Sequence, residues 1–179
     1  MGTHCARRPE AAAVYIYFAA VIFLVAGAAK APAQESGGTK LPQESGMGAA
    51  ILLGEPMGIS AKLWISEVSA LDAGAGWSLF RRMENGVSVR GAPYFYFDYL
   101  RHFFNTVKMQ TGKFVYSIGV GLENALAEDM YMGVRLPFGM SYAFEDAPLD
   151  IFLELVPSIV FFPDITSDMG ASAGLRYWF

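Results

Sequence analysis

Residues suited to nucleophilic, acid–base or metal chemistry are scarce in this chain. Its 179 residues include one cysteine, Cys5, and two histidines, His4 and His102. Two histidines cannot form the imidazole cluster that many metal centres use. A disulfide needs two cysteines, so none can form within the chain. These counts predict no metal site and no cofactor.

Charged residues are the remaining polar chemistry, and six of them occupy the polar face of an alternating segment. They are Lys62, Asp72, Asp98, Arg135, Glu154 and Arg176. Three are cations and three are anions, so together they can neutralise one another. Charges removed from water are costly unless they are paired. We therefore predict an internal charge network, and the elements that position it must be β-strands.

The clearest strand signal is the segment 169–179. Its odd positions are apolar or aromatic, and its even positions are mostly small or polar. A period of two indicates a β-strand whose two faces meet different surroundings. The segment therefore predicts a strand with one polar and one apolar face.

Eight segments of this kind follow one another, separated by turn residues. They span residues 47–54, 57–66, 70–79, 92–104, 113–122, 130–144, 149–161 and 169–179. An even number of strands, each near the roughly ten residues that cross a bilayer obliquely, is typical of a membrane barrel. The sequence predicts an all-β fold, an eight-stranded antiparallel up-and-down transmembrane β-barrel over residues 47–179.

The two faces of these segments differ in side-chain size. The polar face carries mainly glycine, serine and single charges, and the other face is bulky and apolar. Small residues suit the narrow interior of an eight-stranded barrel. We therefore expect the small and charged face inside and the bulky face against lipid. The alternative is a soluble, lipocalin-like periplasmic barrel that binds a ligand in an apolar cavity.

The N-terminal region has the layout of an export signal. Two arginines precede an apolar run over residues 11–29, and small residues follow. This predicts a helical signal peptide over residues 1–33, cleaved after Ala28 or Ala33. A retained membrane anchor is the alternative. Residues 34–46, rich in glycine, serine and glutamine, are expected to form a flexible linker.

Turn positions predict which inward charges meet. If the second and third segments fold about Glu67, Lys62 lies opposite Asp72. Opposite charges facing one another on neighbouring strands attract. Asp98 and Arg135 are expected to meet across the lumen.

A third pair is predicted between the last two segments. If they fold about Ile165, Glu154 lies opposite Arg176, and both keep their inward parity. All six charges would then have a partner. An eight-stranded interior filled in this way is plugged rather than open.

The alternating segments and the ending Gly-Leu-Arg-Tyr-Trp-Phe over residues 174–179 resemble the small bacterial outer-membrane β-barrels of the OmpA transmembrane domain and OmpX type. The stretch Gly-Glu-Pro-Met-Gly-Ile-Ser-Ala-Lys over residues 54–62 also resembles a motif of poorly characterised short outer-membrane proteins. The resemblance covers residues 47–179. It implies that Tyr177 and Phe179 belong to a signal read by the barrel assembly machinery.

The resemblance also implies a cellular setting. The chain would lie in the outer membrane of a Gram-negative-type bacterium, as a monomer in contact with membrane lipids. Periplasmic chaperones and the barrel assembly machinery would be its partners during export. The formal net charge of −4 offers no basic footprint for nucleic acid, so we expect no such partner.

These features favour a non-enzymatic barrel with a structural or surface-interaction role. One alternative is a barrel enzyme that modifies lipid A, which needs an acid–base group or a nucleophile near the membrane interface. His102 is the candidate for that role, but its parity points it inward, so we expect no catalytic residue. A wide pore is not expected, because charges fill the predicted lumen.

Overall fold

The computed structural model describes residues 46–78, 91–109, 112–126 and 130–179. The predicted signal peptide (1–33), its cleavage site and nearly all of the linker (34–46) lie outside these residues. Within the described part of the chain, no helix is long and apolar enough to cross a membrane.

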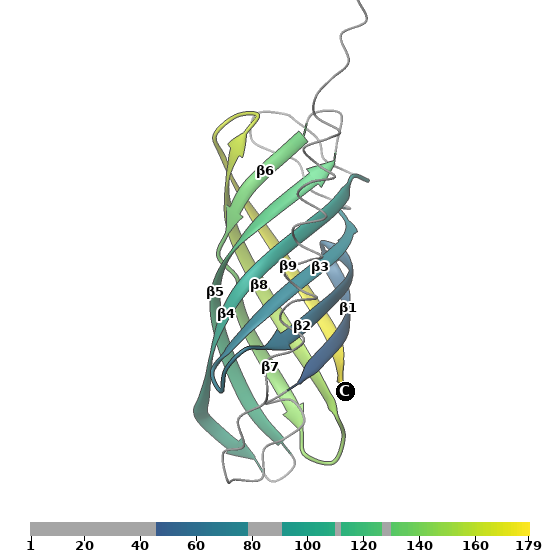
Figure 1. Ribbon diagram of the computed structural model, residues 1–179, viewed down its shortest axis with the longest axis vertical. Coiled ribbons are helices and arrows are strands. Elements are labelled where there is room, and N and C mark those ends of the chain that lie inside the picture. Colours follow the sequence, from purple (N-terminus) through teal and green to yellow (C-terminus); the bar gives the residue numbers. More distant parts are fainter. Residues whose placement is uncertain (1–45, 79–90, 110–111, 127–129) are drawn as a thin grey trace, which may run out of the picture. The chain divides into compact units, whose positions relative to one another are not determined.

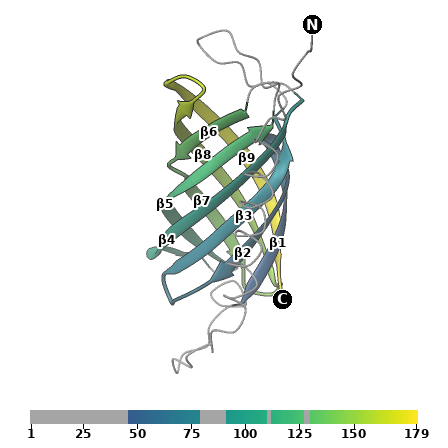
Figure 2. The ribbon, with the colours of Figure 1, turned by 45° about the horizontal axis from the view of Figure 1, so that its top comes forward.

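The described residues form nine β-strand segments. They are β1 (Met47–Glu55), β2 (Met57–Trp64), β3 (Ser69–Trp77), β4 (Pro93–Met109), β5 (Gly112–Leu126), β6 (Met130–Arg135), β7 (Phe138–Phe144), β8 (Leu149–Phe162) and β9 (Thr166–Trp178). All pairings between them are antiparallel. The strands cross the barrel obliquely (Figure 1) and surround a common axis when it is tilted toward the viewer (Figure 2).

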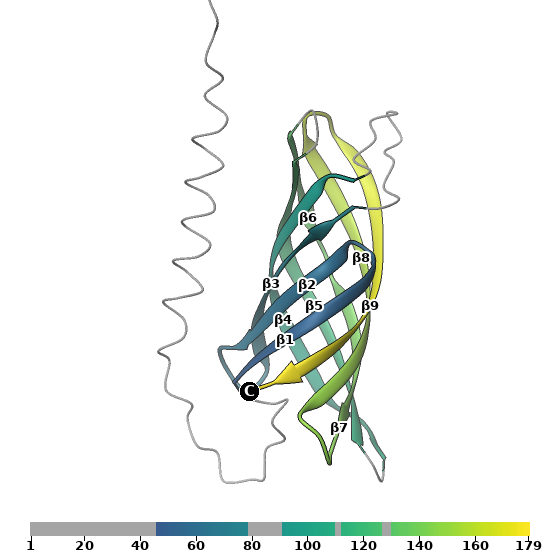
Figure 3. The ribbon, with the colours of Figure 1, turned by 90° about the vertical axis from the view of Figure 1, so that its right-hand side faces the viewer.

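The sheet closes on itself. β1 pairs with β9 over eight residue pairs, from Gly48↔Trp178 to Glu55↔Ala171. Figure 3 shows these two strands, the first and last of the barrel, side by side. The predicted all-β, eight-stranded antiparallel barrel is therefore confirmed as a fold.

β6 and β7 are two halves of one predicted strand, 130–144. They are separated at Leu136 and Pro137, where proline has no N–H to donate to the ladder. Both halves pair with β5 and with β8. Hydrogen bonds also continue through the break, from Leu136 N to Pro157 O (2.9 Å) and from Gly119 N to Pro137 O (2.9 Å). The barrel thus has eight strand positions, and β6 and β7 together occupy one of them.

Several predicted strands were too short at one end or at both. β4 and β5 continue to the pair Met109↔Gly112, with a register shift after Phe103, where the sequence predicted a loop. β9 begins at Thr166 rather than at residue 169. Alternation weakens at these ends, but ladder hydrogen bonds continue, because backbone pairing does not require alternating side chains.

The interior holds the polar face and the exterior holds the apolar one. Large aliphatic side chains project outward along the strands, and Ile51, Ile59 and Leu155 are 58–64% exposed. Charged side chains project inward, and Asp98 and Arg135 are each 1% exposed. The predicted orientation, with the small and charged face inside and the bulky face outside, is therefore confirmed.

Glycines make room for aromatic rings inside the barrel. Gly74 pairs with Tyr96, and Gly174 pairs with Phe152, in each case on the neighbouring strand. A Cβ atom added to either glycine would collide with the ring of its partner. Each ring therefore lies over the space where a side chain is missing and fills the lumen there.

We predict that Gly74→Val lowers the free energy of unfolding by about 1–3 kcal/mol, the usual cost of overpacking. Unfolding in urea, in detergent or lipid vesicles, measures this loss. Adding Tyr96→Ala should recover part of it, because the colliding ring is gone. Ala61→Val, on the exposed face of β2, is the matched control and should change little. Equal stability of Gly74→Val and the wild type would contradict this packing.

Candidate functional site: the charged lumen

A three-residue ion cluster occupies the middle of the lumen. The Arg135 guanidinium, at the end of β6, lies between two carboxylates. Its Nε is 3.3 Å from Asp98 Oδ1, and its NH2 is 3.2 Å from Glu154 Oε1. The guanidinium also lies 3.9 Å from the centroid of the Tyr96 ring, a cation–π contact. One cation thus holds two acids that come from β4 and β8.

The Asp98–Arg135 contact forms along the barrel wall rather than across the lumen as predicted. Asp98 pairs with Gly121 on β5, and Gly121 pairs in turn with Arg135 on β6. Gly121 has no side chain, and a Cβ there would collide with the Asp98 carboxylate. The two charged residues therefore meet over a glycine on the strand between them.

A second cluster lies closer to the end of the barrel where β9 finishes. Arg176 NH2 is 3.0 Å from Asp72 Oδ2, and Arg176 NH1 is 3.8 Å from Asp150 Oδ1. Lys62 Nζ lies 3.8 Å from Asp72 Oδ2, and Lys62 pairs directly with Asp72 in the ladder, as the turn at Glu67 predicts. Two cations and two anions therefore neutralise one another here.

The predicted pairing of Glu154 with Arg176 is wrong. Glu154 lies opposite Ser172, and Asp150 is the residue opposite Arg176. Val160 pairs with Thr166, which centres the β8–β9 turn on Pro163 instead of Ile165. The early start of β9 shifts the register by four residues. Because four is an even number, both charges still point inward, but each lies opposite a different residue.

Arg176 reaches Asp72 over two intervening strands. It pairs with Ala50 on β1, and Ala50 pairs with Ser60 on β2. The neighbouring Gly48 leaves space for the arginine stem, because a Cβ there would lie 2.9 Å from Arg176 Cδ. Small residues on β1 and β2 thus open the route for a long side chain.

Tyrosines hold a further buried acid on the other side of the central cluster. Glu123, 2% exposed, accepts hydrogen bonds from Tyr94 Oη (2.5 Å) and Tyr131 Oη (2.7 Å). Tyr131 Oη also lies 3.3 Å from Asp168, and Arg135 NH1 donates to Tyr94 Oη at 3.3 Å. The tyrosines therefore connect this acid to the central arginine.

His102 lies inside the lumen, as its parity predicts. Its Nε2 is 3.4 Å from Lys62 Nζ, and its ring centroid is 4.3 Å from that of Trp64. The backbone N–H of His102 donates to Val68 O at 2.7 Å. Its side chain is 5% exposed. These contacts place the imidazole among lumen groups and away from the outer surface.

Tyr177 and Phe179, the residues of the expected assembly signal, lie on the opposite side of the wall. They are 48% and 72% exposed, and their rings meet edge to face at 5.2 Å. They take no part in the charged lumen. Their outward position leaves them accessible from outside the barrel.

The sequence analysis did not identify several residues that take part in the contacts of the lumen. Asp150 has the same parity as Glu154, so the alternation of its strand could have found it. Glu123 was assigned to a loop because the predicted fifth strand ended at residue 122, whereas β5 continues to Leu126. Tyr94 has the parity of Asp98 and Tyr131 that of Arg135, so the alternation placed both on the inner face, but it gave no sign that they would hold an acid there.

Within the described residues, no group of three or more histidine, cysteine, aspartate or glutamate side chains is arranged to hold a metal ion. Each inward acid of the two ion clusters has a cation beside it. Such an arrangement fills and stiffens the lumen. Comparison of the chain with protein-family models, with curated proteins and with solved structures finds no match.

We predict that Arg135→Met costs about 3–5 kcal/mol of unfolding free energy, because it leaves Asp98 and Glu154 buried side by side without their cation. Urea unfolding of the refolded chain measures the loss. Adding Asp98→Asn and Glu154→Gln removes both stranded charges, so the triple variant should recover most of it.

Arg101→Gln provides the matched control for Arg135→Met. Arg101 is exposed on β4, so its removal changes the net charge equally without touching the cluster. A surface change of this kind is expected to stay within about 0.5 kcal/mol. If Arg135→Met were as stable as Arg101→Gln, the central cluster would not support the fold.

Proposed function

We propose that residues 47–179 form a non-enzymatic integral outer-membrane β-barrel with a structural or surface-interaction role and a lumen plugged by paired charges. One observation carries the proposal. The outer wall consists mainly of exposed apolar side chains, whereas the charges of the two ion clusters lie within. A water-exposed wall would normally have the reverse arrangement, because exposed apolar surface is unfavourable in water.

Some of the exposed aromatic residues lie at the ends of strands, as a membrane setting would require, while others, such as Phe138 beside Leu155, lie within the wall. Trp77, Phe161 and Phe162 lie at the ends of β3 and β8, and Tyr177 and Phe179 lie at the end of β9. Membrane barrels carry aromatic girdles at both interfaces, around an aliphatic band. The end positions of these residues fit such girdles.

The lumen argues against a soluble ligand-binding barrel. A lipocalin-like protein would need an apolar cavity wide enough for its ligand. Here Arg135, Tyr94 and Tyr131 are each at most 1% exposed and fill the middle of the barrel. Their side chains occupy the position that such a ligand would need.

The geometry of His102 favours a non-enzymatic role. A lipid-modifying enzyme would present its acid–base group toward the membrane interface. The His102 ring instead contacts Lys62 and Trp64 inside the wall. We therefore assign this histidine to lumen packing. Loss of a lipid A modification in a His102→Ala strain would overturn this assignment.

The direct test is the behaviour of the full chain in cells. We expect it in the outer-membrane fraction, where it resists extraction by alkaline carbonate. Its gel migration should shift on boiling, because a folded membrane barrel stays compact in cold detergent. Recovery in the soluble fraction without such a shift would refute the proposal.

We predict that Leu155→Lys, in the middle of β8, destabilises the barrel in lipid vesicles by about 2–4 kcal/mol, because the charge would lie near the bilayer midplane. Urea unfolding in phospholipid vesicles measures this effect. Ile165→Lys is the matched control. Ile165 lies in the β8–β9 turn and is 84% exposed, so lysine should cost only about 0–1 kcal/mol near the interface. Equal, near-zero effects would indicate that water surrounds both sites.

We also predict that the chain inserts into planar bilayers without a stable large conductance. Arg135 and its partners leave no continuous aqueous path in an eight-stranded barrel. Single-channel recording of the refolded protein measures this, with a sixteen-stranded porin as the positive control. Frequent, long-lived openings of porin size would contradict a plugged lumen.

A further inference from the structure

Two prolines lie close together within the wall, on neighbouring strands. Pro137 separates β6 from β7, and Pro157 lies within β8, which pairs with both of them. Proline has no N–H to donate, so it is normally absent from the interior of a sheet. The ladder therefore lacks two donors in one small area of the wall.

The hydrogen bonds that remain show which bonds are missing. Leu136 N donates to Pro157 O at 2.9 Å, and Gly119 N donates to Pro137 O at 2.9 Å. In an antiparallel ladder, two residues paired in this way normally exchange two bonds. The return bonds, to Leu136 O and to Gly119 O, would need the N–H groups that the prolines lack. Each of these two carbonyls therefore receives no bond from the residue opposite it.

The contact between β6 and β8 is the shortest strand pairing in the described part of the chain. It has four residue pairs, and a register shift interrupts them after Met132, whereas β8 shares twelve pairs with β9. Because doubly bonded pairs alternate along a ladder, the first one beyond Leu136 is Val134↔Ile159. The β6–β8 seam, formed by residues 132–135 and 158–162, is therefore the most weakly bonded contact in the described wall.

A buried hydroxyl without a partner lies on the inner side of this seam. Ser158 follows Pro157 and is 4% exposed, and its Oγ has no hydrogen-bond partner among the described residues. An unpaired buried polar group raises the free energy of the state that buries it. Separation of β6 from β8 would let other hydrogen-bonding groups reach this hydroxyl and the Leu136 carbonyl. This gain offsets part of the free energy needed to open the seam.

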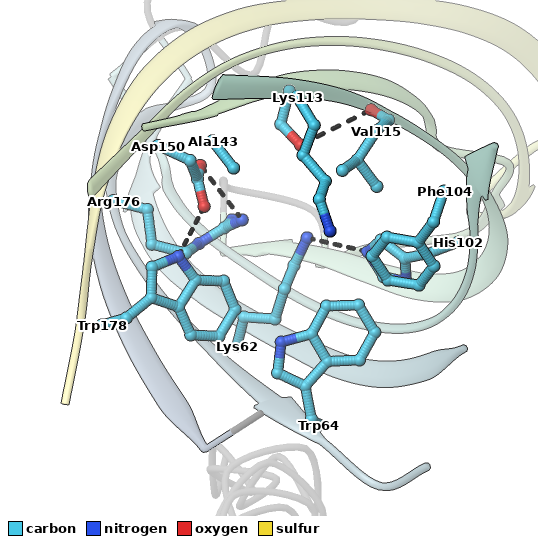
Figure 4. A pocket seen from close by; sticks show the side chains of 11 residues that line it. Lys62, Trp64, His102, Phe104, Lys113, Val115, Ala143, Asp150, Arg176 and Trp178 are labelled. Carbon is cyan, nitrogen blue, oxygen red and sulfur yellow. Dashed lines mark hydrogen bonds and ion pairs between the residues drawn. The ribbon is translucent and has the colours of Figure 1, made fainter. Parts of the chain in front are cut away.

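The lumen has little free space at the end where β9 finishes. Figure 4 shows side chains that line this end from different strands, among them Lys62, Trp64 and Trp178. The space between them is about 10 Å³, near the roughly 10–15 Å³ that a single water needs. A larger molecule therefore has no room to enter the closed barrel from this end.

We propose that the wall opens locally along the β6–β8 seam and that the two prolines place the opening there. Pro157 removes a bond from the seam itself. Pro137 divides the strand, so that β6 can move while β7 stays paired. β6 keeps its pairing with β5, and β8 keeps its pairing with β9. The opening leads sideways into the lumen beside Val160, which is 0% exposed in the closed wall.

This opening depends on backbone hydrogen bonds and not on whether lipid or water surrounds the barrel. A seam that stays closed would therefore leave the proposed membrane location untouched. Conversely, a barrel found in the soluble fraction could still open at this seam.

Amide hydrogen exchange of the refolded full chain, followed by NMR in an uncharged detergent, measures the opening. The N–H groups of Val134 and Ile159 both face the seam. Ile59 and Ala75, a doubly bonded pair of the β2–β3 ladder, are the reference. After correction for intrinsic rates, we expect exchange at Val134 and Ile159 to be about fivefold faster or more. This is the effect of about one lost hydrogen bond.

Pro157→Ala should slow exchange at Val134 and Ile159 about fivefold, because the alanine N–H can donate to Leu136 O. Pro93→Ala is the matched control. Pro93 is exposed at the first residue of β4, which pairs with β3 and β5 and not with the strands of the seam. Its removal should leave exchange at the seam within about twofold of the wild type.

Thiol labelling gives a second measurement that keeps both prolines. In a Cys5→Ser background, Val160→Cys places a thiol behind the seam, and Ala70→Cys places one behind β3. Both native side chains are 0% exposed. We expect a small thiol reagent to label Val160→Cys about fivefold faster or more than Ala70→Cys.

Fast exchange at the seam that Pro157→Ala slows and Pro93→Ala does not would support the proposal. Equal exchange at the seam and at the reference pair would overturn it, and so would fast exchange that Pro157→Ala leaves unchanged. Circular dichroism shows whether each variant is folded. If Pro157→Ala does not fold, the two thiol variants decide, and equal labelling of both would overturn the proposal.

Discussion

The constraint on which this structure depends is that charges inside a narrow closed barrel must meet partners of opposite sign. Among the described ion pairs, Lys62–Asp72 and Arg176–Asp150 join direct neighbours in the ladder, and the others join residues that are not directly opposite. Arg135 reaches Asp98 over Gly121, and Arg176 reaches Asp72 over the small residues of β1 and β2. The glycines and alanines of the lumen are therefore as necessary as the charges. Their small size leaves space through which a longer side chain reaches its partner on another strand.

The same alternation couples the lumen to the outer wall. In a strand, every residue that points inward lies between two that point outward. Asp150, Phe152 and Glu154 face the lumen of β8, so Ile151, Leu153 and Leu155 must face outside. A polar interior and an aliphatic exterior are thus two consequences of one pattern, and a change of parity would reverse both at once.

The alternation alone was sufficient to predict the number of strand positions, their order around the barrel and the direction in which their side chains point. The Lys62–Asp72 register was also predictable, since its turn is short and centred on Glu67. The sequence also paired Asp98 with Arg135, but the route of that contact over Gly121 was not predictable. Nor was the contact of Arg176 with Asp72, because such contacts depend on side-chain length and on which residues between them are small. The β8–β9 register failed for another reason. The centre of that turn depends on where β9 begins, and Thr166, Ser167 and Asp168 do not carry the apolar alternation of the rest of the strand.

A lumen of this width could be filled by apolar side chains at a lower desolvation cost. A strand that is apolar on both faces, however, has no preferred side to turn outward, and a slip of one residue would cost it little. Charges remove this ambiguity. If β9 slipped by one residue, Arg176 would leave Asp72 and point outward, while Leu175 and Tyr177 would enter a polar interior. The ion pairs of the lumen therefore specify the inner face of the strands that carry them, and this is a physical reason for their presence.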